Sequence, residues 1–464
     1  MCFQYSQRFV QNEFLNLTLG DKRLSKRVIN IALSIIKQSD SSIPVALNGE
    51  KKSIKGVYRF FQNKKINDQS ILETHYFNTI ERIKKTKGTI ILISDSTYIN
   101  PAKSRTMPGL RKLGCPAGEK NFMTQGIRVH YTLAYDLKNN EILGITDILI
   151  LDDKKKDSEA LPIRTEIDVW ILSIRNTIEK LQILKKSEEV LSRCIVVGDR
   201  EADFFDFLHE LKDLKIKFII RSKYNRSVEY QNAYEIKTKK ISDLKKDAVL
   251  HGRPYKVLVY SNQKEREAIL QRSVLINTPI FAPGRHPRKD PVDLSVVFVD
   301  EINGPYLKEE RVSWRILSNL QSHSEEDTYF IINLYKKRWL IEELNKCAKT
   351  GLSLEKRQFT RTEYFRPFIA MTFVLAQTFL KMREKTKKKD KSIRDHEIFS
   401  SLEVSFMAKK LNVSKSHISY KEAYHFIAKL GGYINSKNSP GWQSIWIGGK
   451  KFSLLIEGYQ EAFT

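Results

Sequence analysis

Two short apolar runs that each lead to an aspartate constrain the fold of this chain most. Residues 88–93 (GTIILI) precede Asp95, and residues 194–198 (CIVVG) precede Asp199. Both runs are typical of buried strands, and a helix over 204–214 and a strand over 216–220 are predicted after the second. Alternating strands and helices predict an α/β fold whose strand ends share one edge, where the two aspartates are expected. An isolated aspartate at a strand end also suits a turn or a cap.

A third acidic residue lies in the stretch 335–349 (YKKRWLIEELNKCAK). If this stretch is one helix, with about 100° between successive residues, a narrow stripe carries a phenol, a carboxylate and three cations. They are Tyr335, Glu342, Arg338, Lys346 and Lys349. The opposite side is apolar and can be buried: Leu340, Ile341, Leu344, Cys347 and Ala348. A reactive face and a solvated face with i,i+4 ion pairs both suit this pattern.

The charge of the chain favours a polyanionic partner. Its 464 residues include 80 Lys and Arg against 54 Asp and Glu, a net charge of +26. Nucleic acid and an anionic membrane surface both suit such a charge. No apolar run reaches the roughly 18 residues that a membrane span requires, so no membrane association through a span is expected. Four scattered cysteines predict reduced thiols and a cytoplasmic protein, without a zinc site.

Residues 1–85 are predicted to be mostly helical. Asp21 can cap a helix that buries the apolar positions from Leu24 to Ile36 and opens with basic residues. Further on, residues 56–61 (GVYRFF) place Arg59 among aromatic residues. Cations mixed with aromatics suit a DNA-contacting domain, and the alternative is an ordinary helical cap. The candidate contacts in this region are Lys22, Arg23, Arg27 and Arg59.

The rest of the chain divides into an α/β region over 86–384 and a helical tail over 385–464. Within the α/β region, strands are predicted over 127–135 and 142–151, a helix over 158–185, and a β-rich insertion over about 227–310. A strand over 312–317 returns to the core, and an amphipathic helix follows over 361–383. In the tail, Trp442 and Trp446 could serve self-association or pack in a core.

Asp95, Asp199 and Glu342 together suit a metal site. Magnesium prefers oxygen ligands, with one or two protein carboxylates for each ion. Two such ions can activate a water or a 3′-hydroxyl and stabilise the leaving oxygen, while neighbouring cations hold a DNA backbone. The sequence therefore offers a set of residues for metal-dependent cleavage of a nucleic acid.

The spacing Tyr335-x2-Arg338-x3-Glu342-x6-Lys349 resembles the Y-R-E-K signature of the insertion-sequence DDE transposases. Within that family, the similarity is greatest to the group of the bacterial Tn-five transposase, insertion-sequence group four. It extends to RWxIEExxKxxKTG over 338–351, to GDREADxxxxL over 198–208 and to IIRSK over 219–223. It includes LGDKRL over 19–24, GVYRF over 56–60 and AKLGG over 428–432, so it covers nearly the whole chain.

This resemblance implies a ribonuclease-H-like catalytic core over 86–384, with the β-strand insertion and with helical N- and C-terminal domains. The implied ligands of magnesium or manganese, as two ions, are Asp95, Asp199 and Glu342. Tyr335, Arg338 and Lys349 would hold phosphates of the end nucleotides, with Lys346 and Arg221 as further DNA contacts. Trp314 would stack on a base that leaves the duplex, and the alternative for Trp314 is a core position in its strand.

The implied activity is cut-and-paste transposition. The N-terminal domain would bind the inverted DNA ends, and a homodimer would pair two ends in a synaptic complex. Water would nick one strand, the 3′-hydroxyl would form a hairpin, and the opened end would join target DNA. Two alternatives are an inactive DNA-binding repressor derived from a transposase and a nuclease that cuts without joining. A bacterial, nucleoid-associated location is expected. One departure is Gln358, which lies where a DNA-contacting arginine is expected.

Overall fold

The computed structural model divides the chain into two compact units. It describes residues 3–39, 41–101, 107–112, 125–152, 163, 165–231, 236–261, 264–281, 290–304, 311–386, 393, 399–434 and 440–462. The first unit comprises Met1–Gly88, Ser96–Pro162 and Leu340–Thr464, and the second comprises Thr89–Asp95 and Ile163–Trp339. Both units are mixtures of helices and strands, as the alternating pattern predicts.

The second unit is built on a mixed sheet. The start of β1 (Ile90–Ile99) pairs in parallel with β5 (Cys194–Gly198), and β5 pairs in parallel with β6 (Lys217–Arg221). β13 (Ser313–Ser318) then pairs antiparallel with β6, and β12 (Val292–Glu301) with β13. The apolar run in β5 is buried throughout, as is typical of a strand covered on both faces. The predicted return of a strand at 312–317 to the core is confirmed.

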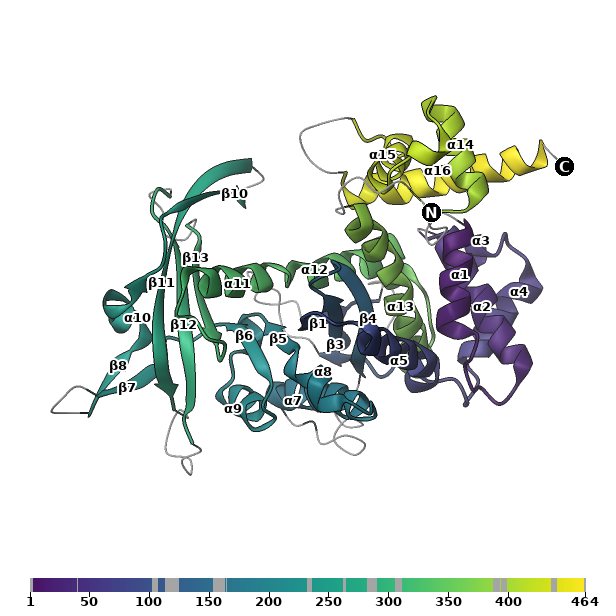
Figure 1. Cartoon of the computed structure of the whole chain (residues 1–464). Helices are drawn as coiled ribbons and strands as arrows, with labels where there is room; N and C mark the ends of the chain where they lie inside the picture. The colour runs from purple at the N-terminus through teal and green to yellow at the C-terminus, as the bar shows by residue number, and fades with distance from the viewer. Residues whose placement is uncertain are drawn as a thin grey trace. The chain divides into compact units, whose positions relative to one another are not determined.

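Most of the described residues in the segment 227–310 lie in strands. The long strands β11 (Lys264–Ile280) and β12 lie side by side (Figure 1) and pair antiparallel, with a register shift between Leu275 and Thr278. β10 (Tyr255–Ser261) and the short β9 (Val249–Leu250) pair with β11, and β7 (Ser227–Gln231) pairs with β8 (Ile236–Lys240). A helical turn, α10 (Ile241–Leu244), interrupts the strands.

Helices of the second unit contact its sheet and one another. They are α7 (Glu166–Gln182), α8 (Ser187–Ser192), α9 (Phe205–Asp213) and α11 (Glu325–Lys336). The predicted helix over 158–185 is thus shorter, and most of the residues before Thr165 lie outside the described part of the chain. Helix α11 contacts β5 and β6, α9 contacts β6 and β12, and α7 packs against α8 and α9. Trp170 of α7 is buried against Phe207 of α9, with ring centroids 5.6 Å apart.

The first unit opens with five helices: α1 (Phe3–Phe14), α2 (Lys22–Lys37), α3 (Ile43–Ala46), α4 (Lys51–Phe61) and α5 (Asp68–Lys85). Asp21 caps α2 as predicted, because its side chain accepts a hydrogen bond of 2.8 Å from the backbone N–H of Arg23. The apolar face of α2 is buried at Val28, Ile31, Ala32, Ile35 and Ile36.

Further along the first unit, a hairpin of long strands is covered by helices. β3 (Gln125–Asp136) and β4 (Glu141–Leu151) pair antiparallel, and the short β2 (Arg111–Lys112) pairs with β3. Helices α5 and α13 (Thr362–Thr386) pack against β4 and against each other (Figure 1). Because α13 lies inside the unit, almost its whole surface is buried.

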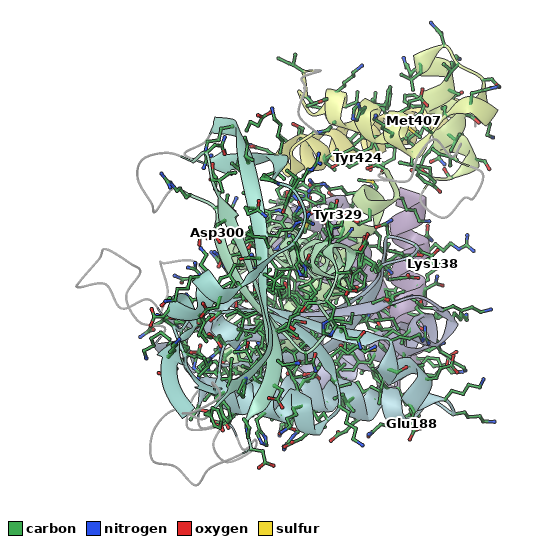
Figure 2. The ribbon with its side chains drawn as sticks, turned by 60° about the vertical axis from the view of Figure 1, so that its left-hand side comes forward. Lys138, Glu188, Asp300, Tyr329, Met407 and Tyr424 are labelled. Carbon is green, nitrogen blue, oxygen red and sulfur yellow. The ribbon has the colours of Figure 1, made fainter. Side chains whose placement is uncertain are left out.

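The C-terminal helices form a core of their own with the end of α13. They are α14 (Ser401–Leu411), α15 (Tyr420–Leu430) and α16 (Trp442–Glu461), and the last is longer than the short helices predicted. Met407 and Tyr424 belong to this cluster (Figure 2). Trp442 and Trp446 stack with ring planes 12° apart, and the indole of Trp446 covers Gly351 so closely that a Cβ there would lie 2.6 Å from it. These contacts favour core packing for both tryptophans.

The prediction of one regular helix over 335–349 is wrong. α11 ends at Lys336, α12 (Trp339–Lys346) follows, and residues Cys347–Gly351 form a π-helical turn. The break arises because the N–H groups of Lys337 and Arg338 bond to carbonyls three residues back instead of four. The predicted apolar side is nevertheless buried, from Leu340 to Ala348, whereas Tyr335 is buried too and does not lie on an exposed stripe.

Some basic stretches and cysteines of the sequence lie wholly or partly outside the described residues. The structure describes residues 103–120 and 385–391 only in part, and Cys2 and Cys115 not at all. Cys194 and Cys347 are buried free thiols, which agrees with the prediction of reduced cysteines. Among the described residues, no helix has the length and apolarity to cross a membrane.

Candidate active site

The register of β1 and β5 places Asp95 and Asp199 at the same level on neighbouring strands. The last paired residues of the two parallel strands are Ile93 and Val197, and each aspartate follows two residues later. The prediction that β1 ends at this point is wrong, because β1 continues to Ile99. Asp95 therefore lies inside β1, at the point where its pairing with β5 ends. Two carboxylates consequently share the carboxyl edge of the parallel strands.

Glycine at position 198 permits the turn that presents Asp199. A Cβ at Gly198 would lie 2.6 Å from the Cβ of Ala202 and 2.9 Å from the side chain of Ile220. The chain turns there into a short 3-10 helix, η1 (Arg200–Ala202), which Asp199 caps. Its Oδ1 accepts a hydrogen bond of 2.7 Å from the N–H of Glu201. Within the described part of the chain, Oδ2 of Asp199 accepts no hydrogen bond, so this oxygen is available to a ligand.

Arg338 lies beside the first carboxylate. Its Nη1 is 3.8 Å from Oδ2 of Asp95, and both side chains are largely buried. Arg338 reaches this position from the turn after α11, where the helix breaks. A guanidinium at this position can also offer its N–H groups to a phosphate. The structure thus brings together three of the predicted site residues.

An aromatic pair lies in the same unit. Trp314 of β13 and Tyr335 of α11 meet edge to face, with ring centroids 5.4 Å apart. Trp314 is half-buried and pairs in register with Val299 of β12. Arg221 ends β6, and its guanidinium donates to the carbonyl of Ser313, which precedes Trp314. Tyr335 thus supports the indole from one side and leaves part of it exposed.

Asp203 organises the loop after β6, a role that the sequence did not reveal. Its buried carboxylate forms an ion pair of 2.6 Å with Arg226 and accepts hydrogen bonds from the backbone N–H groups of Lys223 and Tyr224. In the sequence, Asp203 stands directly before the predicted helix over 204–214, which gives no hint of this role. No spacing rule connects it with residues some 20 positions later, so only the tertiary structure reveals this function.

Glu342 belongs to the first unit, where α12 is firmly held. Glu342 is half-buried, and its neighbour Glu343 is buried in an ion pair with Arg383 of α13. Tyr131 of β3 donates hydrogen bonds to the carbonyl of Ile341 and to Oδ1 of Asn345, at 3.1 and 2.8 Å. These contacts fix the rotation of α12 about its axis and therefore the direction of Glu342.

The remaining predicted cations of this segment differ in environment. Lys346 is exposed, whereas Lys349 lies on the π-helical turn and is half-buried. Burial lowers the pKa of Lys349, and the nearby carboxylate of Glu355 partly opposes this effect. The carboxylate of Glu355 also accepts a hydrogen bond of 2.9 Å from the N–H of Asn100, and Gln358 is exposed.

The described residues supply part of a binding site for a divalent ion. Asp95 and Asp199 supply neighbouring carboxylate oxygens, the ligands that magnesium and manganese accept. The described residues contain no group of three or more His, Cys, Asp and Glu side chains arranged to hold one ion. Asp95 and Asp199 are therefore the two candidate carboxylates that the structure brings together.

The N-terminal helices carry the other predicted contacts on exposed faces. In α2, Lys22, Arg23 and Arg27 are exposed, opposite the buried apolar face. In α4, Arg59 is exposed together with Lys51, Lys52 and Lys55, within an arc of about 100°. The two helices pack together, and the guanidinium carbon of Arg27 would lie 3.7 Å from a Cβ at Gly56. Their basic faces suit a DNA backbone.

Comparison with protein families agrees with this arrangement. Residues 6–66, from α1 to α4, match the family described as transposase DNA-binding. Residues 175–376, which include Asp199, Trp314 and Glu342, match the family described as transposase DDE domain. The chain therefore combines a segment similar to transposase DNA-binding domains with a segment similar to transposase DDE domains.

Proposed function

We propose that the chain is a cut-and-paste DNA transposase of the Tn-five group in which Asp95, Asp199 and Glu342 hold two magnesium ions, with manganese as a substitute. The observation that carries the proposal is the register of β1 and β5, which aligns Asp95 with Asp199. The match to the DDE domain, which includes Glu342, supports the third ligand. When bound, the ions activate a water or a 3′-hydroxyl and stabilise the leaving oxygen.

The neighbouring side chains position the DNA in this proposal. Arg338 offers its guanidinium to a phosphate next to Asp95, and Tyr335 supports the indole of Trp314. Lys346, Lys349 and Arg221 add further phosphate contacts. Positioning of this kind lowers the barrier because the reacting oxygen and phosphorus are held in line before the reaction.

The order of reaction steps follows from the same proposal. Water nicks one strand, the freed 3′-hydroxyl attacks the opposite strand to form a hairpin, and water opens it. The 3′ end then joins target DNA. Two subunits pair two inverted ends, which the basic faces of α2 and α4 bind. A bacterial protein associated with the nucleoid would meet this substrate.

A change that removes the charge of Glu342 and keeps the size of its side chain tests the proposal. Glu342→Gln is expected to retain binding to a duplex that carries the inverted end, a sequence that is first to be identified in the DNA flanking the gene. The rate of magnesium-dependent nicking is expected to fall by more than about 100-fold. Loss of a residue that only supports a metal ligand costs about 10- to 100-fold. Gel-shift titration and a nicking time course measure the two quantities.

The matched control is Glu326→Gln, which makes the same change at an exposed position of α11. Nicking by Glu342→Gln at the wild-type rate would disprove the assignment of Glu342. Absence of nicking by the wild-type protein on its own ends would instead favour an inactive repressor. Nicking without any strand-transfer product would favour a nuclease.

Trp314 tests the hairpin step. Trp314→Ala removes the half-buried indole that Tyr335 supports, and stacking on an aromatic ring is worth roughly 1–3 kcal/mol per base. Hairpin formation is therefore expected to slow more than the first nick, as separated by denaturing gels of end-labelled duplex. Trp314→Phe is expected to restore part of the difference. Equal losses at both steps would show that Trp314 only stabilises its strand.

A further inference from the structure

A polar cavity lies in the first unit between α1, α5, α13 and the β3–β4 hairpin. Its volume is about 220 Å³, which far exceeds the about 10–15 Å³ that a single water needs and is below the roughly 300 Å³ where drug-sized sites begin. Four cations line it, namely Arg8, Arg82, Lys381 and Lys385, together with three carboxylates, those of Glu13, Glu141 and Glu384. The size suits a small polar ligand.

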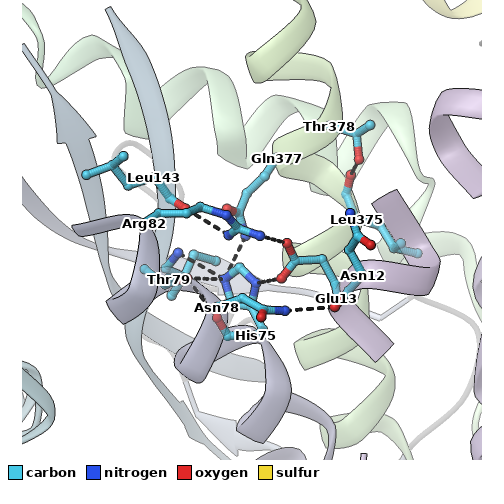
Figure 3. A network of polar contacts seen from close by, with 11 residues as sticks. Asn12, Glu13, His75, Asn78, Thr79, Arg82, Leu143, Leu375, Gln377 and Thr378 are labelled. Atoms are coloured by element: carbon cyan, nitrogen blue, oxygen red, sulfur yellow. Dashed lines mark hydrogen bonds and ion pairs between the residues drawn. The ribbon is translucent and has the colours of Figure 1, made fainter. Parts of the chain in front are cut away.

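Two of the three carboxylates are already satisfied by the protein. Glu13 is buried and pairs with both Arg82 and Nδ1 of His75 (Figure 3). Nε2 of His75 accepts a hydrogen bond of 3.0 Å from the N–H of Ile145. Nδ1 of His75 therefore carries the proton and donates a hydrogen bond to the carboxylate of Glu13. The carboxylate of Glu384 accepts a hydrogen bond of 3.0 Å from the hydroxyl of Tyr135.

Lys381 lacks an equivalent partner. Its ammonium lies 5.3 Å from the centre of the Phe9 ring, and within the described part of the chain no oxygen accepts a hydrogen bond from it. Its pKa is lowered to about 7, mainly by burial and then by the cation of Arg82, against the opposite effects of Glu13 and Glu141. A poorly solvated ammonium is costly unless an anion compensates it.

We propose that this cavity is a binding site for a small oxyanion of the phosphate class, held by Lys381 and by the cations at its rim. The ammonium of Lys381 supplies up to three donors, and Arg82 lines the same cavity. An oxyanion has several acceptor oxygens, so it can satisfy these donors where a halide offers only one centre. A lone phosphate enters the cavity, whereas the phosphates of a duplex are fixed to a backbone too wide for it.

Occupation of the site would stabilise the docking of α1. Arg8 and Glu13 belong to α1, within the segment that matches the DNA-binding family, whereas Arg82 and Lys381 belong to α5 and α13. An anion that contacts both sides links this segment to the helices that cover β4. This proposal does not depend on transposition or on the metal ligands.

Trace acetylation of lysines followed by peptide mass spectrometry tests the site in the full-length protein. Inorganic phosphate is titrated at pH 7.5, with ionic strength held constant by chloride. Phosphate at about ten times its dissociation constant is expected to lower the acetylation rate of Lys381 about tenfold. The rate at Lys84, which is exposed on α5 outside the cavity, is expected to stay unchanged.

Lys381→Met gives an independent readout, since it keeps the length of the side chain and removes the charge. Phosphate is expected to raise the melting temperature of the wild type and of Lys84→Met, and not that of Lys381→Met. If Lys381→Met does not fold, the proposal is tested by whether phosphate protects Lys381 of the wild type from acetylation. Equal acetylation of Lys381 in phosphate and in chloride would overturn the proposal. The proposal would also be overturned if a short DNA duplex protected Lys381 and inorganic phosphate, at the same concentration of phosphate groups, did not.

Discussion

Asp203 shows how one buried carboxylate can determine the conformation of a loop that is distant in sequence. It receives two backbone N–H groups and the guanidinium of Arg226, so the loop after β6 has a single partner at its centre. Its neighbour Asp199 has one oxygen engaged, by the N–H of Glu201. Two acids four residues apart therefore differ in role because one is fully bonded and the other is not.

Asp203→Ala is expected to lower the free energy of unfolding by about 3–5 kcal/mol, because it leaves the guanidinium of Arg226 buried without its anion. Urea denaturation followed by circular dichroism measures the change. Asp213→Ala, at the exposed end of α9, is the control and is expected to have an effect below about 0.5 kcal/mol. A similar small effect at Asp203 would mean that the loop is held by other contacts.

Among single residues, those with local signals could be predicted from the sequence. Asp95 and Asp199 follow apolar runs, and Asp21 precedes a basic helix start, so each carries its own pattern. The bonds of Asp203 and the ion pair between Arg338 and Asp95 join positions far apart in sequence. Such contacts depend on how the strands assemble, which a pattern in one segment does not contain.

At the level of elements, the helical periodicity of the sequence correctly predicted which apolar side chains are buried, but it did not predict where the helix is interrupted. The apolar positions from Leu340 to Ala348 are buried as the pattern requires, yet the helix breaks at Lys337 and ends in a π-helical turn. Side-chain hydrophobicity reports which face meets the core. It does not report whether a backbone N–H bonds to the third, fourth or fifth preceding carbonyl, which the packing on α13 and Trp446 decides.

The buried network between α1, α5, β4 and α13 makes the docking of these elements depend on pH. Burial lowers the pKa of His75, and this outweighs the opposite effect of Glu13, so the unfolded chain binds a proton that the folded one does not. Stability is therefore expected to fall as the pH drops below about 6.5, by at most about 1.4 kcal/mol per pH unit for this group.

Glu13 extends the same dependence to lower pH. Although burial opposes it, the contacts with His75 and Arg82 lower the pKa of Glu13 to about 2. Its contribution is present above the ordinary value of 4.5 and is lost as the pH falls towards 2.

In urea titrations between pH 7 and 4.5, His75→Gln is expected to reduce the slope of stability against pH, and the exposed control His323→Gln is expected to keep it. Identical slopes for all three proteins would refute this assignment.

For the molecule as a whole, the net charge of +26 predicts DNA affinity that depends strongly on salt. Arg59→Gln removes one exposed cation from the basic face of α4. If Arg59 contacts a phosphate, the slope of log affinity against log salt is expected to become about 0.9 less steep. Fluorescence anisotropy with an end duplex between 50 and 200 mM salt measures it. Lys138→Gln, at an exposed turn of the β3–β4 hairpin, is expected to leave the slope unchanged.

The division of the chain into two compact units could not be predicted from the sequence. The predicted boundaries follow composition along the chain, whereas β1 contributes Asp95 to one unit and Ser96 to the other. A compact unit is defined by contacts between distant segments, such as the packing of α5 and α13 on β4. Composition alone contains no record of those contacts, so the boundaries at 85 and 385 stay predictions.

The stacked indoles of Trp442 and Trp446 give the end of the chain an optical label. Two stacked, nearly parallel chromophores whose centroids are 6.1 Å apart couple their electronic transitions, and this coupling is sensitive to their mutual orientation. The second ring also rests on Gly351, so undocking of the last helix would disturb the pair. Near-ultraviolet dichroism can therefore follow the seating of α16 without any added dye.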